Sequence, residues 1–316
     1  MARPIEPDLL MRDAGTTRVG ERSAIPSLVR SVRPEQWTKN LIVFAALLFG
    51  QKLLDPEAVA RSAAAFAIFC VLSGVVYLVN DLFDQDADRQ HPTKRFRPIA
   101  SGELSTSAAK AWAGALAAGA LGAALWLSPA FAGVAAAYLL LFAIYSRWLK
   151  HIVILDVLSI AIGFVLRTDA GAAAIDVPVS DWLLVCTMLL ALFLGLAKRR
   201  HELTLLAGSA ADHRRILNEY NPYLLDQMIG VVTASTLMAY IIYCTNPETI
   251  ERFGTRNLVL TVPLPIYGIL RYLYLVHRRD GGGNPSELLI TDRPLLICVA
   301  LWGLVTATVI YRPFGL

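Results

Sequence analysis

Nine apolar runs, most of them about 20 residues long, recur along this 316-residue chain and limit what it can fold into. A helix needs about 20 apolar residues to cross a bilayer, whereas a transmembrane β-strand is shorter and alternates in polarity. Hydrophobic residues make up 56% of the chain and charged residues only 17%, at a mean hydropathy of +0.52, which excludes an ordinary soluble domain. We predict an all-α, polytopic membrane protein with about nine transmembrane helices, at 41–54, 62–82, 109–128, 131–146, 152–174, 182–197, 224–245, 257–276 and 294–311.

Lysine and arginine residues gather in every second connection between these runs, and the net charge is +4. The positive-inside rule then predicts that the N-terminus and the large polar loops face the cytoplasm, as in a multi-pass protein of the inner or plasma membrane. We expect a disordered cytoplasmic tail over 1–24, an interfacial amphipathic helix within 25–37, and a single transmembrane domain over 25–316. The charge indicates anionic lipid or phosphate partners beside the bilayer and gives no indication of nucleic acid.

A ladder of aspartates follows the second run. In a helix Asp81, Asp84 and Asp88 fall at i, i+3 and i+7 and share one face, while Asp86 points to the opposite side. Like charges on one stripe repel each other unless a cation joins them, and an all-oxygen ligand set suits Mg²⁺. The spacing therefore predicts that these three aspartates bind Mg²⁺ together with substrate phosphate; a charged loop at the membrane surface is the alternative.

Basic side chains follow the ladder and recur at the same predicted side of the membrane. They suit a metal-bound diphosphate, because the metal takes some phosphate oxygens and the basic groups take the rest. Simple membrane-surface anchoring is the alternative for each of them. The candidates are Lys94, Arg95 and Arg97 after the ladder, Tyr145 and Lys150 at the end of the fourth run, and Lys198, Arg199 and Glu202 after the sixth run.

The fifth run carries ionisable residues inside an apolar stretch, where they are costly enough to suggest function. Asp156 lies near the predicted cytoplasmic end and is expected to meet a ligand cavity. Arg167 lies deeper, so that pairing with another buried group is an alternative to substrate binding. Lys198 and Glu202, at i and i+4, are equally compatible with a surface ion pair.

Several of these motifs resemble those of a known superfamily. The pattern Asn-Asp-x-x-Asp-x-x-x-Asp at 80–88 after the second of nine spans resembles the UbiA-type intramembrane prenyltransferases, which are all-α and bind Mg²⁺–diphosphate at such a motif. Members usually carry a second aspartate ladder after the sixth span, where this chain has KRRHEL. In this respect the chain resembles the decaprenyl-phosphate phosphoribosyltransferase branch of the superfamily. The segments that carry the resemblance are KRRHEL at 198–203, RPEQWTKN at 33–40 and YSRWLKH at 145–151.

The resemblance implies an enzyme that moves 5-phosphoribose from 5-phosphoribosyl-1-diphosphate (PRPP) to a polyprenyl phosphate, for cell-wall arabinan precursors. Residues 25–316 would then be its catalytic domain, with Mg²⁺ as cofactor. The rival readings are an orthodox prenyl transfer from a prenyl diphosphate to an aromatic or other acceptor, and a transporter or lipid-binding membrane protein. Small residues over 113–119 would also allow a homo-oligomer.

The resemblance and the chemistry of PRPP together suggest a role for each candidate. The Mg²⁺–diphosphate is assigned to the ladder and its basic neighbours, the 5-phosphate to a second basic cluster, and the lipid phosphate to the segment before the first span. We further expect two side chains to orient the ribose. The diphosphate residues are Asn80, Asp81, Asp84, Asp88, Lys94 and Arg97; the 5-phosphate residues Lys198, Arg199 and Lys150; the ribose residues Tyr145 and Asp156; and the lipid-phosphate residue Lys39 or Arg33.

Overall fold

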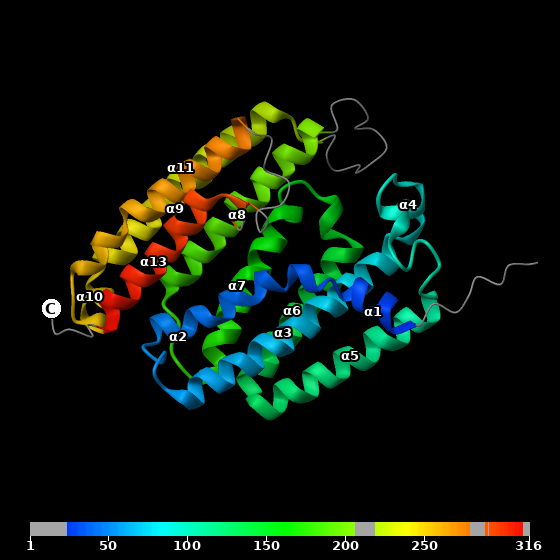
Figure 1. Cartoon of the computed structure of the whole chain (residues 1–316), viewed down its shortest axis with the longest axis horizontal. Coiled ribbons are helices and arrows are strands. Elements are labelled where there is room, and N and C mark those ends of the chain that lie inside the picture. Colours follow the sequence, from blue (N-terminus) through cyan, green and yellow to red (C-terminus); the bar gives the residue numbers. More distant parts are fainter. Residues whose placement is uncertain (1–23, 206–218, 279–287, 290, 312–316) are drawn as a thin grey trace, which may run out of the picture.

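The computed structural model of the chain describes residues 24–205, 219–278, 288–289 and 291–311. All regular elements in these ranges are helical (Figure 1). The bounds are α1 Ala24–Val32, η1 Pro34–Phe44, α2 Ala45–Phe49, α3 Pro56–Phe83, α4 Gln85–Gln90, η2 Lys94–Phe96, α5 Thr106–Leu127, α6 Pro129–Arg147, η3 Leu149–His151, α7 Leu155–Ile175, α8 Asp181–Leu205, α9 Pro222–Thr245, α10 Pro247–Phe253, η6 Asn257–Thr261, α11 Pro263–Arg278 and α13 Arg293–Tyr311.

Eight helical segments among the described residues are long and apolar enough to cross a membrane, and they match the last eight predicted spans. The first predicted span, 41–54, differs, because the chain forms the 3-10 helix η1, then the short helix α2, and turns after Phe49. At about 2.0 Å per residue in η1 and 1.5 Å in α2, the two helices together, Pro34–Phe49, extend about 30 Å, the thickness of the hydrocarbon core. The protein is therefore an integral, multi-pass membrane protein. The predicted tail over 1–24 lies outside the described residues, except for Ala24.

Short polar residues followed by proline set the start of several helices. Asp55, Ser128, Asn221 and Asn246 each accept a hydrogen bond from a backbone N–H in the first turn, and each is followed by a proline at the first helical position. Proline suits that position because its φ is already helical and the missing N–H has no partner there in any case. These dipeptides divide the apolar sequence into separate helices with short connections.

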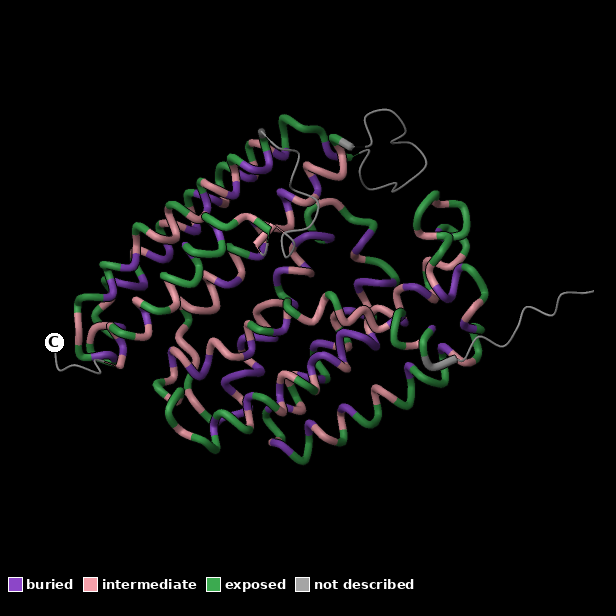
Figure 2. Tube along the Cα trace, in the orientation of Figure 1, coloured by how far each residue is buried: buried purple, intermediate pink, exposed green. Residues whose placement is uncertain are grey.

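Helices that are neighbours in sequence pack side by side from α5 through α9, and α3 packs on α5, α6 and α7. Half or more of the apolar stretches of α3 and α7 is buried, against a third or less for the other spans, so these two helices form the centre. Figure 2 shows the buried residues along the inner sides of the helices. η1 packs against both α3 and α7. Gly171 permits this contact, since a Cβ there would lie 2.0 Å from the carbonyl oxygen of Val43.

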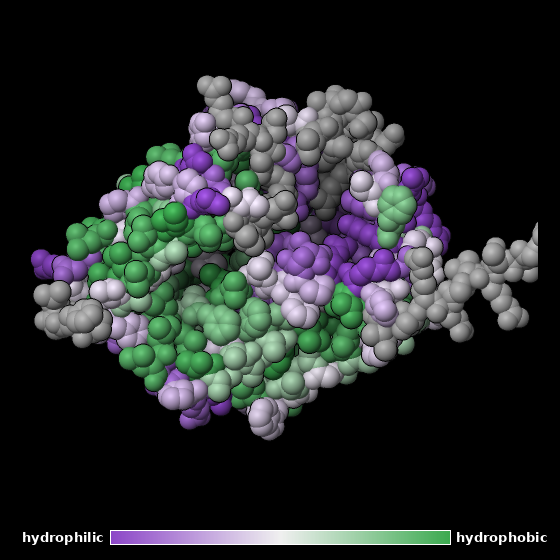
Figure 3. Space-filling model, in the orientation of Figure 1, coloured by the Kyte–Doolittle hydropathy of each residue, from purple (hydrophilic) through white to green (hydrophobic). Residues whose placement is uncertain are grey.

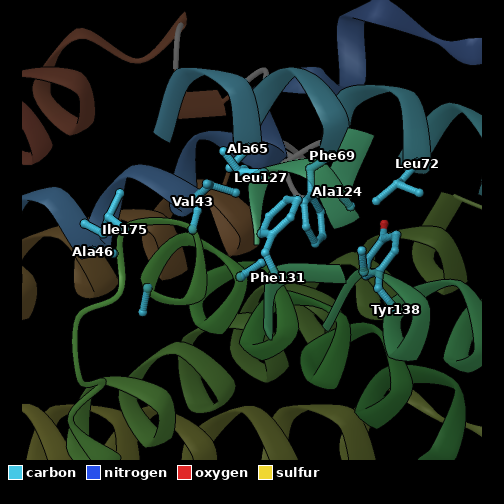
Figure 4. Close-up of a cluster of buried hydrophobic side chains, with 14 of the residues drawn as sticks. Val43, Ala46, Ala65, Phe69, Leu72, Ala124, Leu127, Phe131, Tyr138 and Ile175 are labelled. Atoms are coloured by element: carbon cyan, nitrogen blue, oxygen red, sulfur yellow. The ribbon is translucent and has the colours of Figure 1, made fainter. Parts of the chain in front are cut away.

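Aromatic side chains join α3 to α6 in the largest buried cluster. The ring of Phe69 lies 5.8 Å from that of Phe131 and 5.2 Å from that of Tyr138, both in edge-to-face geometry (Figure 4). All three residues are almost completely buried. Because such pairs add about 0.5–1.5 kcal/mol each to the burial of the rings, they hold Tyr138 in a fixed position beside the site described below.

Candidate active site

A cavity of about 1690 Å³ lies inside the bundle, lined by residues of η1, α3, α4 and α6 and of helices from α7 to α13. One end of its wall is polar and includes Asp84, Lys150 and Lys198, whereas the other is apolar and includes Leu183 and Val299. Figure 3 shows the same division on the surface: hydrophilic residues gather around a hollow at the end that carries α4, and hydrophobic residues cover much of the rest of this face. Such a cavity suits a ligand with a charged head and a hydrocarbon chain.

The aspartate ladder lies where α3 ends and α4 begins. Asp84 caps the end of α3 with a backbone outside the regular helical range, so the helix is interrupted in the middle of the ladder. Asp84 and Asp88 line the cavity, and the Asn80 amide donates a hydrogen bond of 3.0 Å to Asp84 Oδ2. Asp86 points away, as predicted, with a side chain that is 94% exposed.

Asp81 is held beneath two arginines and is absent from the cavity wall. Its side chain is 2% exposed. Arg33 donates to both of its carboxylate oxygens, at 2.6 and 2.8 Å, and Arg97 donates to Oδ1 at 3.1 Å and to Asp88 Oδ2 at 2.6 Å. Burial raises the pKa of Asp88, although the Arg97 charge opposes the shift. The arginines, which do line the cavity, are thus positioned by carboxylates behind and beside them.

Arg33 reaches this place through an unusual backbone. It joins α1 to η1 with a left-handed φ of 52°, a conformation that costs an ordinary residue about 1 kcal/mol or more. Its guanidinium also stacks over the Tyr77 ring at 4.8 Å. The strained residue thereby connects the N-terminal helix α1, which packs on α3, directly to the ladder.

Lys150 faces the ladder from the short helix η3, after the end of α6. Its ammonium lies 2.5 Å from Asp84 Oδ1 and 3.4 Å from Asn80 Oδ1, and the side chain is 7% exposed. Tyr145 and Ser146 line the same wall. The Ser146 hydroxyl is buried and makes no hydrogen bond to any residue that the structure describes, which leaves it available to a ligand.

A second charged cluster joins α7, α8 and the segment directly before α9. Arg199 donates to Asp156 at 2.8 Å and to Glu202 at 2.7 Å, and the Tyr220 hydroxyl donates to Asp156 at 2.8 Å. Lys198 lies 3.9 Å from Glu202. The predicted Lys198–Glu202 pair is therefore present. The charge of Arg199 is compensated by two carboxylates within the protein.

The donor set of the ladder fits a hard divalent cation. The amide oxygen of Asn80 and the carboxylates of Asp84 and Asp88 all line the cavity, and all are oxygen ligands. Within the described ranges, no three acidic, histidine or cysteine side chains converge to form a ready metal cage. Mg²⁺ does not need one, because it commonly binds through one or two carboxylates together with substrate phosphates and water.

The structure brings most of the predicted site residues to one cavity. Asp81, Arg95 and Asp156 are not among them, since Asp81 and Asp156 are buried behind the wall and Arg95 is exposed and stacks on Phe96. The residues that do line it are Arg33, Lys39, Asn80, Asp84, Asp88, Lys94, Arg97, Tyr145, Lys150, Arg167, Lys198, Arg199 and Glu202.

Sequence reasoning missed four residues that hold these groups in place. Tyr77, Tyr138 and Tyr220 contact Arg33, Arg167 and Asp156, respectively, and Asn40 accepts a hydrogen bond from Arg167. A polar atom inside an apolar run was the available signal for Tyr138, but a tyrosine there is also compatible with ordinary packing. Asn40 lies directly before the first predicted run, where a polar residue gives no such signal.

The fold and the site together describe a helical membrane protein whose cavity has a charged end and an apolar end. The model of the UbiA prenyltransferase family matches residues 41–289, and the chain belongs to that family. Curated relatives include the decaprenyl-phosphate phosphoribosyltransferase of Mycolicibacterium smegmatis, 33% identical over 93% of this chain and 95% of that protein. The protein of the same name from Corynebacterium glutamicum is 32% identical, over 94% and 90%.

Solved structures show the same fold. The UbiA homolog from Archaeoglobus fulgidus bound to DMAPP and Mg²⁺ superposes with a TM-score of 0.70, covering 90% of this chain and 99% of that one at 20% identity. The predicted all-α bundle and the predicted superfamily are both confirmed.

Proposed function

We propose that this protein transfers 5-phosphoribose from PRPP to a polyprenyl phosphate such as decaprenyl phosphate, releasing diphosphate. The product would be a polyprenyl-phosphoryl-5-phosphoribose, a precursor for cell-wall arabinan. The names of the relatives support this activity. The observation that carries it is that one cavity holds both an oxygen-ligand ladder and further basic side chains outside the ladder, at Lys39, Arg167, Lys198 and Arg199. Related enzymes usually have a second aspartate ladder at the position of Lys198 and Arg199. PRPP is anionic at both ends, so it needs metal ligands at one end and cations at the other.

Asn80, Asp84 and Asp88 are the residues that would hold Mg²⁺ with the diphosphate of PRPP. When bound, Mg²⁺ supplies positive charge to the diphosphate oxygens as negative charge develops on the leaving group. Asp81 is assigned a different role, because it lies behind the cavity wall and holds Arg33 and Arg97. This assignment replaces the predicted metal contact of Asp81 with a positioning role.

The basic residues around the ladder stabilise the departing diphosphate. Lys150, Arg33 and Arg97 line the cavity and each already contacts a ladder carboxylate, so they are oriented before any substrate binds. Groups oriented in advance cost no reorganisation when charge develops in the transition state. Tyr145 is assigned to orient the ribose hydroxyls, together with the Ser146 hydroxyl, which makes no hydrogen bond within the described part of the chain.

The acceptor needs no general base. A phosphate monoester oxygen is already anionic at neutral pH and can attack C1 of the ribose from the face opposite the diphosphate, which inverts the configuration at C1. The polyprenyl chain would lie along the apolar end of the cavity, past Leu183 and Val299. The distribution of basic residues supports a cytoplasmic position for the polar end of the site.

A transfer assay tests the proposal. Purified protein in detergent is incubated with Mg²⁺, PRPP labelled in the ribose, and decaprenyl phosphate, and the label that partitions into the lipid phase is counted. We expect lipid-linked label that depends on Mg²⁺ and on the lipid. The Asp84→Asn variant should give none while eluting like the wild type in size-exclusion chromatography. An active Asp84→Asn variant would contradict the metal assignment.

A further inference from the structure

Arg167 is a buried cation in the cavity wall without a carboxylate partner among the described residues. It lies on α7 and is 5% exposed. Its Nε donates to Asn40 Oδ1 at 2.8 Å and its Nη2 to the Tyr138 hydroxyl at 2.6 Å, both of them neutral groups. Its Cζ lies 4.9 Å from the ring centres of Tyr138 and Phe164. An arginine within a membrane span is costly, and these contacts compensate its charge only in part.

The orientation of Arg167 is fixed from two sides. Asn40 also donates to the Ser73 hydroxyl at 3.2 Å, which ties it to α3. Tyr138 is packed in the aromatic cluster around Phe69. Nη1 donates no hydrogen bond to any residue in the described ranges, so one donor group of a firmly held guanidinium is left for a ligand in the cavity.

Lys39 brings a second cation to the same wall. Its ammonium makes no hydrogen bond or ion pair with a residue that the structure describes, and three further basic residues, Arg33, Arg167 and Lys198, line the same cavity. Positive charge is therefore in excess on this part of the wall.

The cations around the ladder differ in this respect. Arg33, Arg97 and Lys150 each pair with an aspartate, so the carboxylates there compensate their charge. The cavity thus has one region where carboxylates and cations alternate, and another, at Lys39 and Arg167, where no carboxylate of the described residues pairs with the cations. A metal-bound diphosphate suits the first region, and an anion without a metal suits the second.

We propose that Lys39 and Arg167 form a second anion subsite that binds a phosphate monoester, with about two negative charges to match two cations. The inference rests on the proposed function, in which two substrate groups have this chemistry: the 5-phosphate of PRPP and the phosphate of the lipid. Arg167, held by Asn40 and Tyr138, supplies a fixed donor to the subsite, and Lys39 supplies a second cation.

Binding measurements separate the two sources. Ribose 5-phosphate and farnesyl phosphate are titrated separately into purified protein by calorimetry, and pyrophosphate with Mg²⁺ serves as a third ligand. Loss of a charge-assisted hydrogen bond should raise Kd about tenfold or more. We expect Lys39→Met to raise the Kd of one monoester about tenfold or more. The Kd of pyrophosphate with Mg²⁺ should stay within about twofold of its wild-type value. The weakened monoester identifies the source.

The matched control is Lys110→Met, which removes an exposed lysine on α5 outside the cavity and should change none of the three Kd values. Lys39 makes no hydrogen bond within the described ranges, so its loss is not expected to disturb folding. Arg167→Lys, which keeps the charge but loses the fork of donors, should weaken the same monoester. Thermal unfolding of each variant checks that the fold is retained.

Unchanged Kd values for both monoesters in folded Lys39→Met would overturn the inference, as would wild-type protein that binds neither monoester. These titrations do not require turnover. If Lys39→Met weakens a monoester but no ribose is ever transferred, the proposed function fails and the subsite stands. If ribose is transferred and Lys39→Met leaves the Kd values of both monoesters unchanged, the proposed function stands and the subsite fails.

Discussion

Asp81→Asn should weaken PRPP binding without altering the dependence on metal. The carboxylate accepts two hydrogen bonds from Arg33 and one from Arg97, and hydrogen bonds to charged groups contribute about 1.5–3 kcal/mol each. Several effects reduce the loss. Arg33 and Arg97 are 21% and 25% exposed, Arg97 keeps its 2.6 Å bond to Asp88, and the new amide can still accept one hydrogen bond. We estimate a net loss of about 1.5 kcal/mol, which corresponds to a rise in KM for PRPP of about tenfold.

The assay measures initial rates against PRPP at saturating Mg²⁺ and lipid, and against Mg²⁺ at saturating PRPP. The half-saturating Mg²⁺ concentration should stay within about twofold of the wild type for Asp81→Asn, because this carboxylate lies behind the cavity wall. Electron paramagnetic resonance of Mn²⁺ bound with pyrophosphate gives a readout without turnover. Asp86→Asn, at an exposed position, is the control. If Asp81→Asn weakens Mn²⁺ binding as much as Asp84→Asn does, Asp81 is a metal ligand and the reasoning is refuted.

Three further predictions follow from single contacts. Lys150→Met removes the ammonium 2.5 Å from Asp84 and should lower kcat in the transfer assay about 100-fold or more; a loss under threefold would contradict its role. Tyr220→Phe leaves the Ile154 N–H and Asp156 each without one partner, and should destabilise the protein by about 1–3 kcal/mol, measured as a lower midpoint of thermal unfolding. Gly171→Ala should lower the yield of folded protein in size-exclusion chromatography, whereas Gly122→Ala, with open space around it, should not; equal yields would disprove the close contact of η1 with α7.

Most of the fold could be predicted from hydrophobic runs, because each membrane-spanning helix satisfies its own backbone and must be apolar outside. Eight spans follow from that rule. The first span does not, since its course as a 3-10 helix depends on packing between α3 and α7 and on the absence of a Cβ at Gly171. The sequence of residues 34–49 contains no local pattern from which the contact of η1 with α3 and α7 could be predicted.

The sequence could predict which residues take part in the candidate site, but not which of them contact one another. Clustered charges at the ends of spans indicated which residues share the cavity. The helical face predicted for the ladder was only partly correct, because Asp84 and Asp88 line the cavity whereas Asp81, in the last turn of α3, is buried behind the wall. Asp156 and Arg199 were predicted as separate ligand contacts, yet they pair with each other. Which charged residue takes which partner depends on distances between helices, and spacing along the chain carries no such information.

One side-by-side measurement tests the central claim most directly. The same purified protein is given labelled PRPP with decaprenyl phosphate in one reaction, and labelled geranyl diphosphate with 4-hydroxybenzoate in another, each with and without Mg²⁺. The proposed phosphoribosyl transfer predicts labelled lipid in the first reaction only, and only with Mg²⁺. A prenylated aromatic product in the second, with no labelled lipid in the first, would contradict the account and assign the chain to the orthodox prenyltransferases of its family.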